Sequence, residues 1–231
     1  MHTKSIYEDG TYLANNPTWG EQDSPWKAEN IDRLLKKNNI HPSTVCEVGC
    51  GAGAILSCLA NRYDKTQFSG YEISPHALEM CNRKARPNLR FFHRNLLDDS
   101  AAGFDVVMAI DVFEHVEDYF GFLRSLREKG TYKVFHIPLD LSVQWVLRSS
   151  PIIKTRLSVG HLHHFTKETA LATLKETGYE VLDYFYTNAS ELPNRGWKAD
   201  LLKIPRKLLF LLDQDLTVRV LGGFSLMVLA K

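Results

Sequence analysis

The chain has 231 residues, of which 44% are hydrophobic and 24% charged, a composition typical of a soluble globular protein of one domain. Its 28 lysine and arginine residues nearly balance its 27 aspartate and glutamate residues, which argues against a nucleic-acid partner that binds by overall charge. The N-terminus lacks the apolar segment of a signal peptide, and no apolar run approaches a membrane span. We therefore expect a cytoplasmic protein.

The cysteines support this expectation. Four are present, with neither a C-x-x-C pair nor the spacing of a zinc finger: Cys46, Cys50, Cys58 and Cys81. Reduced thiols are the usual state of such cysteines in the cytosol.

The region after residue 43 alternates short apolar runs with helical patterns. Strands are expected at 44–49, 66–74, 88–95, 103–112 and 131–138. Helices are expected at 53–63, 75–85 and 119–130. Strands that alternate with helices predict an α/β fold, in which helices cover both faces of a parallel sheet.

The last third of the chain departs from this alternation. A helix that starts after Thr166 as its N-cap is expected to end at Gly178, with a strand after it and another at the C-terminus. We predict a single domain, 1–231. Its predicted parts are an N-terminal helical cap (1–43), a core (44–187 and 223–231) and lid insertions (140–165 and 188–222).

The stretch "VCEVGCGAGAIL" places three glycines, Gly49, Gly51 and Gly53, between a strand and a helix. Such a turn lets a ligand approach the main chain and points free N–H groups at it. A dinucleotide loop has the spacing G-x-G-x-x-G, whereas here the third glycine comes one residue early. Glu47, just before the loop, would repel a diphosphate but suits a ligand that carries an ammonium group.

A second carboxylate completes this pattern. Glu72 ends the second strand, 21 residues after Gly51, where an acidic side chain commonly accepts hydrogen bonds from ribose hydroxyls. The expected ligand is therefore a nucleoside with a compact zwitterionic tail, and S-adenosylmethionine fits this description.

Four segments in this order, "EVGCGAG", "GYEIS", "FDVVMAIDVFEHVED" and "HLHHFTKETALATLKETGYEV", resemble the class I S-adenosylmethionine-dependent methyltransferases. The subset that they resemble includes the ubiquinone-biosynthesis methyltransferases (methyltransferase types 11 and 23). The resemblance implies a Rossmann-like, seven-stranded, mostly parallel sheet with the last strand antiparallel. It also implies S-adenosylmethionine as the cofactor.

The resemblance assigns cofactor contacts by position. Glu47, Gly49 and Gly51 are expected around the methionine part, with Cys50 and Gly53 in the same loop; Glu72 is expected at the ribose and Ile73 on the adenine. Asn95 and Leu96 stand where the family usually has an aspartate and an apolar residue near the adenine amine, and Ile110 and Asp111 are expected near the transferring methyl. In this family N-terminal segments fold over the cofactor, so Tyr12 and Trp19 are candidates for a lid.

The stretch "DVFEHVED" carries the candidate catalytic residues Asp111, Glu114 and His115. Three interpretations stay open: His115 acts as a general base, the three residues bind a divalent metal, or they orient and cap the backbone. The spacing resembles that of metal-dependent O-methyltransferases, although Asp111 stands where those have glutamate. In "GHLHHF", alternation puts His161 and His163 on one face, as pocket-lining candidates.

Segment 198–221 is a basic amphipathic stretch in which Lys198, Lys203, Arg206 and Lys207 precede "LLFLL" and Pro205 is expected to start a helix. It suits a lid, a dimer contact or a peripheral membrane contact, and monomer and homodimer both stay open.

We expect a methyltransferase that acts on a small-molecule acceptor at oxygen. The alternatives are a metal-assisted RNA 2′-O-methyltransferase and a non-catalytic methyltransferase-like binding subunit.

Overall fold

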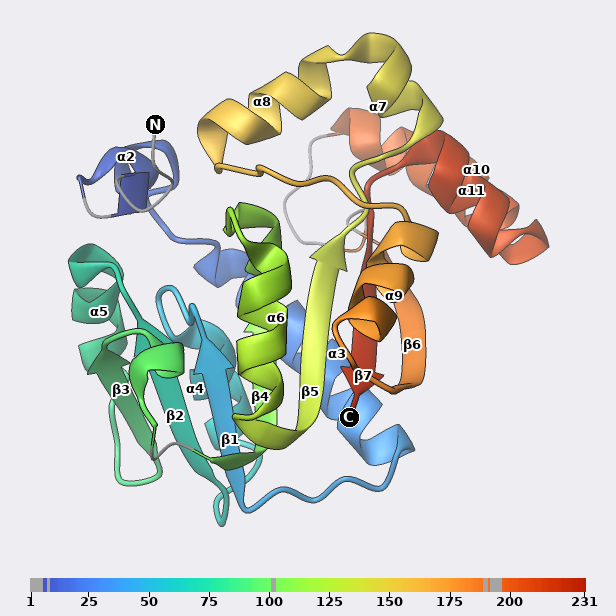
Figure 1. Ribbon diagram of the computed structural model, residues 1–231. Helices are drawn as coiled ribbons and strands as arrows, with labels where there is room; N and C mark the ends of the chain where they lie inside the picture. Colours follow the sequence, from blue (N-terminus) through green and yellow to red (C-terminus); the bar gives the residue numbers. More distant parts are fainter. Residues whose placement is uncertain (1–5, 8, 101–102, 189–190, 192–196) are drawn as a thin grey trace.

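A seven-stranded sheet forms the centre of the molecule (Figure 1). The computed structural model describes residues 6–7, 9–100, 103–188, 191 and 197–231, with the backbone alone for 197–203 and 205. The strand order is β3-β2-β1-β4-β5-β7-β6, and β7 runs antiparallel to both of its neighbours. The strands are β1 (Thr44–Val48), β2 (Gln67–Glu72), β3 (Leu89–His93), β4 (Phe104–Ile110), β5 (Gly130–Pro138), β6 (Val181–Asn188) and β7 (Phe224–Ala230). The predicted Rossmann-like α/β fold is confirmed, including the antiparallel last strand.

Helices cover both faces of this sheet because the central strands are apolar on both sides. In β4, Val107 and Ala109 belong to one core cluster, and Val106 and Met108 belong to the other. The first cluster lies under α6 (Tyr119–Arg127) and α9 (Lys167–Glu176). The second lies under α3 (Ser24–Lys37), α4 (Ala54–Ala60) and α5 (Pro75–Asn82).

The remaining helices lie beyond the carboxyl ends of the parallel strands, at the top of Figure 1. The N-terminal segment contributes α2 (Thr11–Asn15) and the short helix η1 (Glu21–Asp23). The expected lid insertions form α7 (Val143–Arg148) and α8 (Ser150–Ser158), and α10 (Trp197–Leu212) and α11 (Gln214–Leu221). Among the described helices, none is both long and apolar enough to cross a membrane.

The observed helix α10 corrects one expectation. It begins at Trp197, so Pro205 lies inside the helix and does not start it. The fixed φ of proline is compatible with helical backbone, so a proline can lie within a helix as well as at its start. The side chains of Lys198 and Lys203, part of the expected basic cluster, lie outside the described residues.

Candidate active site

A cavity of about 910 Å³ opens where the parallel strands end. The loops after β1, β2, β4 and β5 form its floor, and the N-terminal segment and the chain after α8 form its walls. In open α/β sheets, ligands bind at the carboxyl ends of the strands, beside the point where the strand order reverses. Here that point lies between β1 and β4.

The glycine loop connects β1 to α4 at the bottom of this cavity. Gly49 and Gly51 have φ values of +63° and +53°, a region that side chains disfavour, and both line the cavity. Gly53 has a different part: it is absent from the cavity lining, and a Cβ there would lie 2.6 Å from the Phe91 ring. The third glycine thus allows α4 to pack closely, while Cys50, between the first two, lines the cavity.

Glu72 fixes the shape of this loop. Its Oε2 accepts a hydrogen bond from Gly51 N (2.8 Å), and its Oε1 accepts from Ile73 N and Ser74 N (both 2.8 Å). Burial raises the pKa of Glu72, whereas these three backbone N–H groups oppose the increase. A carboxylate offers about four lone pairs, so it retains the capacity to accept from a hydroxyl in the cavity.

Glu47 lies at the end of β1 and lines the same cavity. It is 1% exposed, and its Oε2 has no hydrogen-bond partner among the described residues. Burial raises the pKa of Glu47 to about 8. A buried carboxyl group without a partner is costly, so this position favours a ligand that supplies a cationic donor.

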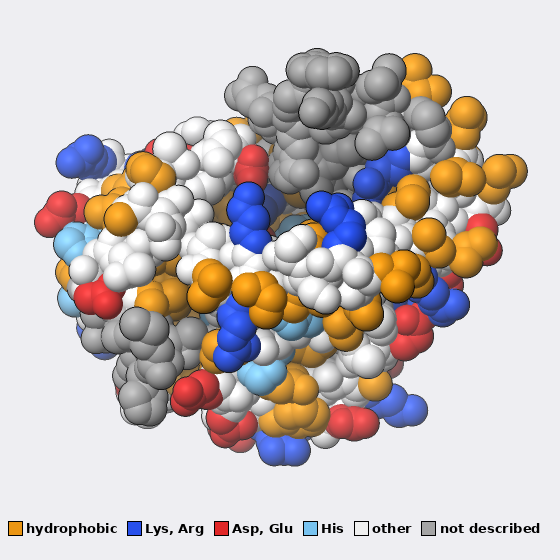
Figure 2. Space-filling model, turned by 90° about the horizontal axis from the view of Figure 1, so that it is seen from above, with side chains coloured by type: hydrophobic (Ala, Val, Ile, Leu, Met, Phe, Trp, Pro, Cys, Tyr) orange, Lys and Arg blue, Asp and Glu red, His pale blue; other side chains and the backbone are white. Residues whose placement is uncertain are grey.

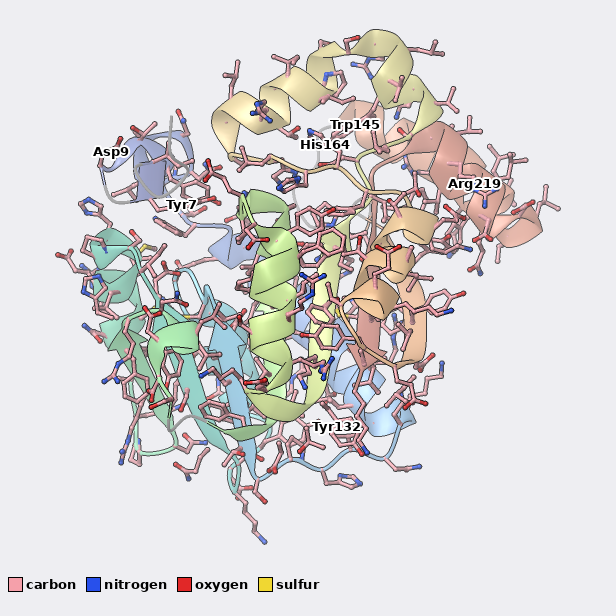
Figure 3. All side chains as sticks on the ribbon, viewed as in Figure 1. Tyr7, Asp9, Tyr132, Trp145, His164 and Arg219 are labelled. Atoms are coloured by element: carbon pink, nitrogen blue, oxygen red, sulfur yellow. The ribbon has the colours of Figure 1, made fainter. Side chains whose placement is uncertain are left out.

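Aromatic side chains from the N-terminal segment cover the loop. The ring of Tyr12 lies 4.9 Å from that of Tyr7 and 4.6 Å from that of Trp19, between their centroids. A Cβ on Gly51 would lie 3.6 Å from Trp19, which therefore faces the bare backbone of the loop. Trp19 itself has a φ of +48°, an uncommon conformation for a bulky residue. Figure 3 shows Tyr7 next to α2, above the strands.

The cavity is also lined by Ile73, Asn95 and Leu96. Asn95 Oδ1 accepts a hydrogen bond from Leu97 N (3.1 Å), so the side chain caps the short helix η2 (Leu96–Asp98). Cap and cavity contact are compatible, because the amide oxygen has a second lone pair.

Asp111 follows β4, beside Ile110, and both line the cavity. Its carboxylate binds Lys27 Nζ and His136 Nδ1, each at 2.6 Å, and its φ is +54°. Burial opposes ionisation, but His136 and Lys27 lower the pKa of Asp111 well below its usual range. No sequence pattern indicated Lys27, since a lysine in the first turns of a helix usually faces solvent.

Glu114 and His115 belong to a short helix, η3 (Phe113–His115). Glu114 is 1% exposed and does not line the cavity; in the described part of the chain neither of its carboxylate oxygens has a hydrogen-bond partner. Its backbone oxygen accepts from Leu162 N (2.9 Å) and His163 N (3.1 Å). His115 lines the cavity, and burial, with His161 beside it, lowers its pKa to about 4.

The histidines of "GHLHHF" separate in space. His161 lines the cavity, its Nδ1 lies 2.6 Å from Asp140 Oδ2, and its ring lies 4.8 Å from that of His115. His163 instead faces away from the cavity, because its Nε2 bonds Val116 O (2.9 Å) and its ring packs on Tyr119. The segment has no regular strand geometry, so alternation does not hold. Asp140 had no sequence signal beyond following a strand.

Among the residues that the structure describes, two groups of side chains could hold a metal ion: Glu114 with His115 and His161, and Asp140 with His161 and His164. Within each group the ligand atoms lie within 4.8 Å of one another. His164, seen below α8 in Figure 3, lies 3.5 Å from Asp140. Asp111 belongs to neither group, and its carboxylate binds Lys27 and His136, so neither group reproduces the full set of the metal interpretation left open by the D-x-x-E-H spacing.

Comparison with known proteins identifies the family of this chain and structures with a similar fold. Residues 19–184 match the family described as the methyltransferase domain. One similar solved structure is that of the cyclopropane synthase MmaA2 from Mycobacterium tuberculosis (18% identity, TM-score 0.61, covering 88% of this chain and 83% of that one). Another is the N-methyltransferase NodS from Bradyrhizobium japonicum WM9 in complex with S-adenosyl-L-homocysteine (17%, 0.62, 100% and 98%). A third is magnesium protoporphyrin IX methyltransferase from Synechocystis PCC 6803 with S-adenosylhomocysteine bound (15%, 0.60, 89% and 82%).

The chain belongs to the methyltransferase-domain family and has the fold of the class I S-adenosylmethionine-dependent methyltransferases. The prediction of an enzyme of this class, with S-adenosylmethionine as its cofactor, is confirmed. The similar structures include enzymes named for different acceptors, so the acceptor has to be argued from the cavity itself.

Proposed function

We propose that the chain transfers the methyl group of S-adenosylmethionine to a hydroxyl oxygen of a small molecule. The observation that carries the choice of oxygen is the pair Asp140–His161 at the cavity wall. A hydroxyl must lose its proton during methylation, and a histidine held by a carboxylate is a suitable general base. An amine that is already neutral attacks through its free lone pair and needs no such pair.

The residues around the cavity suit the two halves of the cofactor. Glu47 would bind the ammonium of the methionine part, because it lines the cavity and its Oε2 has no hydrogen-bond partner among the described residues. The N–H groups of the glycine loop surround the same region, and Glu72 would accept from the ribose. The adenine would lie between Ile73 and Leu96, with Asn95 at its edge, and Tyr12 and Trp19 above. Bound there, S-adenosylmethionine supplies an electrophilic methyl group on a sulfonium.

The proposed chemistry is an in-line displacement in which positioning supplies much of the rate. The Asp140 carboxylate accepts a hydrogen bond from His161 Nδ1–H, which leaves the Nε2 lone pair of His161 to take the hydroxyl proton. As the new O–C bond forms, the C–S bond breaks and its electron pair stays on sulfur. Asp140 then stabilises the imidazolium. Neighbouring His115, whose pKa is lowered to about 4, stays neutral and does not repel that charge.

Two measurements test this function in order. Calorimetric titration with S-adenosylmethionine, S-adenosylhomocysteine and NAD should give micromolar binding of the two adenosyl ligands alone. A panel of matched alcohols, phenols and amines should then be methylated at oxygen, and Asp140→Asn should reduce kcat about a hundredfold or more while the affinity for S-adenosylhomocysteine is unchanged. Methylation of amines alone, with Asp140→Asn fully active, would refute the oxygen acceptor.

Metal assistance is a second candidate, favoured by one observation. Within the described part of the chain the buried Glu114 carboxylate has no hydrogen-bond partner, and its Oε1 lies 3.8 Å from His115 Nε2. His161 completes this group, and Asp140 would orient it as carboxylates orient metal-bound histidines. Dialysis against a chelator separates the candidates, because a base mechanism keeps its activity and a metal mechanism loses it until Zn²⁺ or Mg²⁺ is restored. The same samples test the other two alternatives. Activity on RNA alone would indicate a 2′-O-methyltransferase. Cofactor binding without turnover on any acceptor would indicate a binding subunit.

A further inference from the structure

The helices above the cavity form one continuous layer, which we call the roof: α8, α7, α11 and α10, each packed on the next. Gln144 Nε2 in α7 donates to Leu221 O in α11, and the ring of Phe210 in α10 stacks on that of Phe224 in β7 at 5.2 Å. The roof is joined to the N-terminal segment as well, since Asn16 Nδ2 donates to Ser158 O (3.1 Å). The roof is therefore attached both to the sheet and to the N-terminal segment.

The roof exposes apolar stripes to solvent. In α10, Ile204, Leu208 and Leu211 are spaced i, i+4, i+7 on one face, 72%, 58% and 71% exposed. The other roof helices repeat this pattern at i, i+3 or i+4 spacing; the exposed residues are Val143, Val146 and Leu147 in α7, Ile153 and Leu157 in α8, and Leu216 and Val220 in α11. Amphipathic helices normally turn such a stripe toward a core. An exposed apolar surface of this extent marks an interaction site.

The charges among these stripes are cationic. Arg148, Lys154 and Arg156 are exposed on α7 and α8, and Lys207 is exposed on α10. Between residues 141 and 167 the sequence has no aspartate or glutamate at all. Figure 2, which looks down on the roof, shows orange apolar side chains with blue cationic ones among them.

The roof carboxylates whose side chains are described are Asp213, exposed at the start of α11, and Asp215 within it; the side chain of Asp200 in α10 lies outside the described residues. Asp213 caps α11 by accepting from Leu216 N (2.9 Å). Asp215 binds Lys167 and Tyr186, and Arg219 pairs with Glu168 of α9. The apolar stripes and the exposed cations of α7 and α8 therefore suit a partner that is both apolar and anionic.

We propose that the roof lies on an anionic lipid bilayer, and that the acceptor hydroxyl belongs to a molecule in that bilayer. The apolar stripes would enter the headgroup region while Arg148, Lys154, Arg156 and Lys207 contact lipid phosphates. The segment that follows α8 also forms the cavity wall, through Val159 and His161, so the docked face adjoins the cavity. The acceptor assignment rests on the proposed function; the bilayer contact does not.

A second copy of the chain fits the roof less well. A two-fold interface brings the same patch together from both subunits, so these cations would face one another without a carboxylate between 141 and 167 to pair with. Like charges that face one another across an interface oppose association. The bilayer is the occupant that satisfies both the apolar and the cationic side chains.

Co-sedimentation of the full chain with vesicles tests the proposal. The chain should bind vesicles of equimolar phosphatidylcholine and phosphatidylglycerol, and should not bind phosphatidylcholine alone. Because each basic residue near an anionic surface changes partitioning about fivefold, Arg148→Gln/Lys154→Gln/Arg156→Gln should lower it about a hundredfold. The matched control Lys65→Gln/Arg90→Gln/Lys175→Gln removes three exposed cations outside the roof and should bind like the unaltered chain.

Apolar variants and two further measurements complete the test. Leu211→Ser/Leu212→Ser should also weaken vesicle binding, since both leucines are more than two-thirds exposed (71% and 83%) and should not affect folding. Equal partitioning of the roof triple variant and its control would overturn the proposal, as would a dimer in sedimentation velocity that these leucine changes dissociate while vesicles do not bind. Calorimetry with S-adenosylhomocysteine on the same samples separates the two proposals. Cofactor binding without vesicle binding refutes only the bilayer contact, and absent cofactor binding refutes the proposed function.

Discussion

At the scale of single residues, the two carboxyl groups beside the glycine loop differ in what surrounds them. Glu72 accepts three backbone N–H bonds, whereas Glu47 Oε2 has no partner among the residues described. Two acidic residues that look alike in the sequence are therefore expected to act differently. Glu72 holds the loop in shape, and Glu47 is available for charge pairing with a ligand.

This difference predicts a proton-linked affinity. In the free protein the pKa of Glu47 is raised to about 8, so the group is mostly protonated near neutral pH. A bound ammonium would lower that pKa, so binding of S-adenosylhomocysteine should release a proton and its affinity should rise with pH until about pH 8. Calorimetry in two buffers with different ionisation enthalpies measures the release. Glu47→Gln should abolish this contribution; an unchanged release in that variant would contradict the assignment.

Glu72 gives a second prediction at this scale. In Glu72→Gln the amide N–H₂ would face backbone donors in place of one carboxylate oxygen, and at least one bond to Gly51, Ile73 or Ser74 would be lost. Hydrogen bonds to a charged group contribute about 1.5–3 kcal/mol, so affinity for S-adenosylhomocysteine should fall about tenfold to a hundredfold. Glu79→Gln, an exposed change on the neighbouring helix α5, is the matched control and should bind normally.

At the scale of elements, what was predictable from the sequence is what local patterns determine. The apolar runs, the glycine loop and the cap at Thr166 indicated the strands, the turn and the start of α9. The contacts that hold Asp111 and His161 at the cavity are not local: Lys27 and Asp111 are 84 residues apart, and Asp140 and His161 are 21 apart. The irregular loop that separates His161 from His163 has no period from which their directions could be read.

The helix α9 shows how a local pattern becomes stability. Thr166 Oγ1 accepts from Thr169 N (3.2 Å), and Thr169 Oγ1 accepts from Thr166 N (3.0 Å), which forms a capping box. Thr166→Ala should lower the free energy of unfolding by about 1 kcal/mol, and Thr166→Ser should retain most of the stabilisation that the cap provides. In thermal unfolding this corresponds to a decrease of about 2–4 °C for a chain of this size. An alanine variant as stable as the serine variant would show that the cap contributes nothing.

At the scale of the whole molecule, a series of bonded polar side chains, the polar chain, crosses the carboxyl ends of β4, β5 and β6 and the amino end of the antiparallel β7. Lys27 in α3 binds Asp111 after β4; Asp111 binds His136 in β5; and His136 Nε2 lies 2.8 Å from Thr187 Oγ1 in β6. Thr187 in turn donates to Ser225 O in β7 (3.3 Å). The polar chain connects the N-terminal segment that carries Tyr12 and Trp19 to the sheet, next to the cavity.

Removing the central charge should therefore affect both stability and binding. Asp111→Asn keeps the size of the side chain and tolerates the φ of +54°, but it leaves Lys27 without its counter-ion. Breaking a largely buried pair in this way should lower the free energy of unfolding by about 3–5 kcal/mol, and urea unfolding would measure this loss. Because the variant also loosens the N-terminal segment, its affinity for S-adenosylhomocysteine should fall. Lys27→Met/Asp111→Asn should be less destabilised than the sum of the two single variants, since both partners are removed together.

The pH dependence follows from the sign of the shift. The pKa of Asp111 is lower in the folded protein than in the unfolded chain, whose aspartates have values of about 3.9. Its stabilising contribution is therefore complete above that unfolded value and is lost as the pH falls toward the folded one. The unaltered chain should lose more unfolding free energy in acid than Asp111→Asn does, and the two curves should converge at low pH. Parallel curves would mean that Asp111 is not held ionised by Lys27 and His136, and the polar chain across the strands would then lack its central charge.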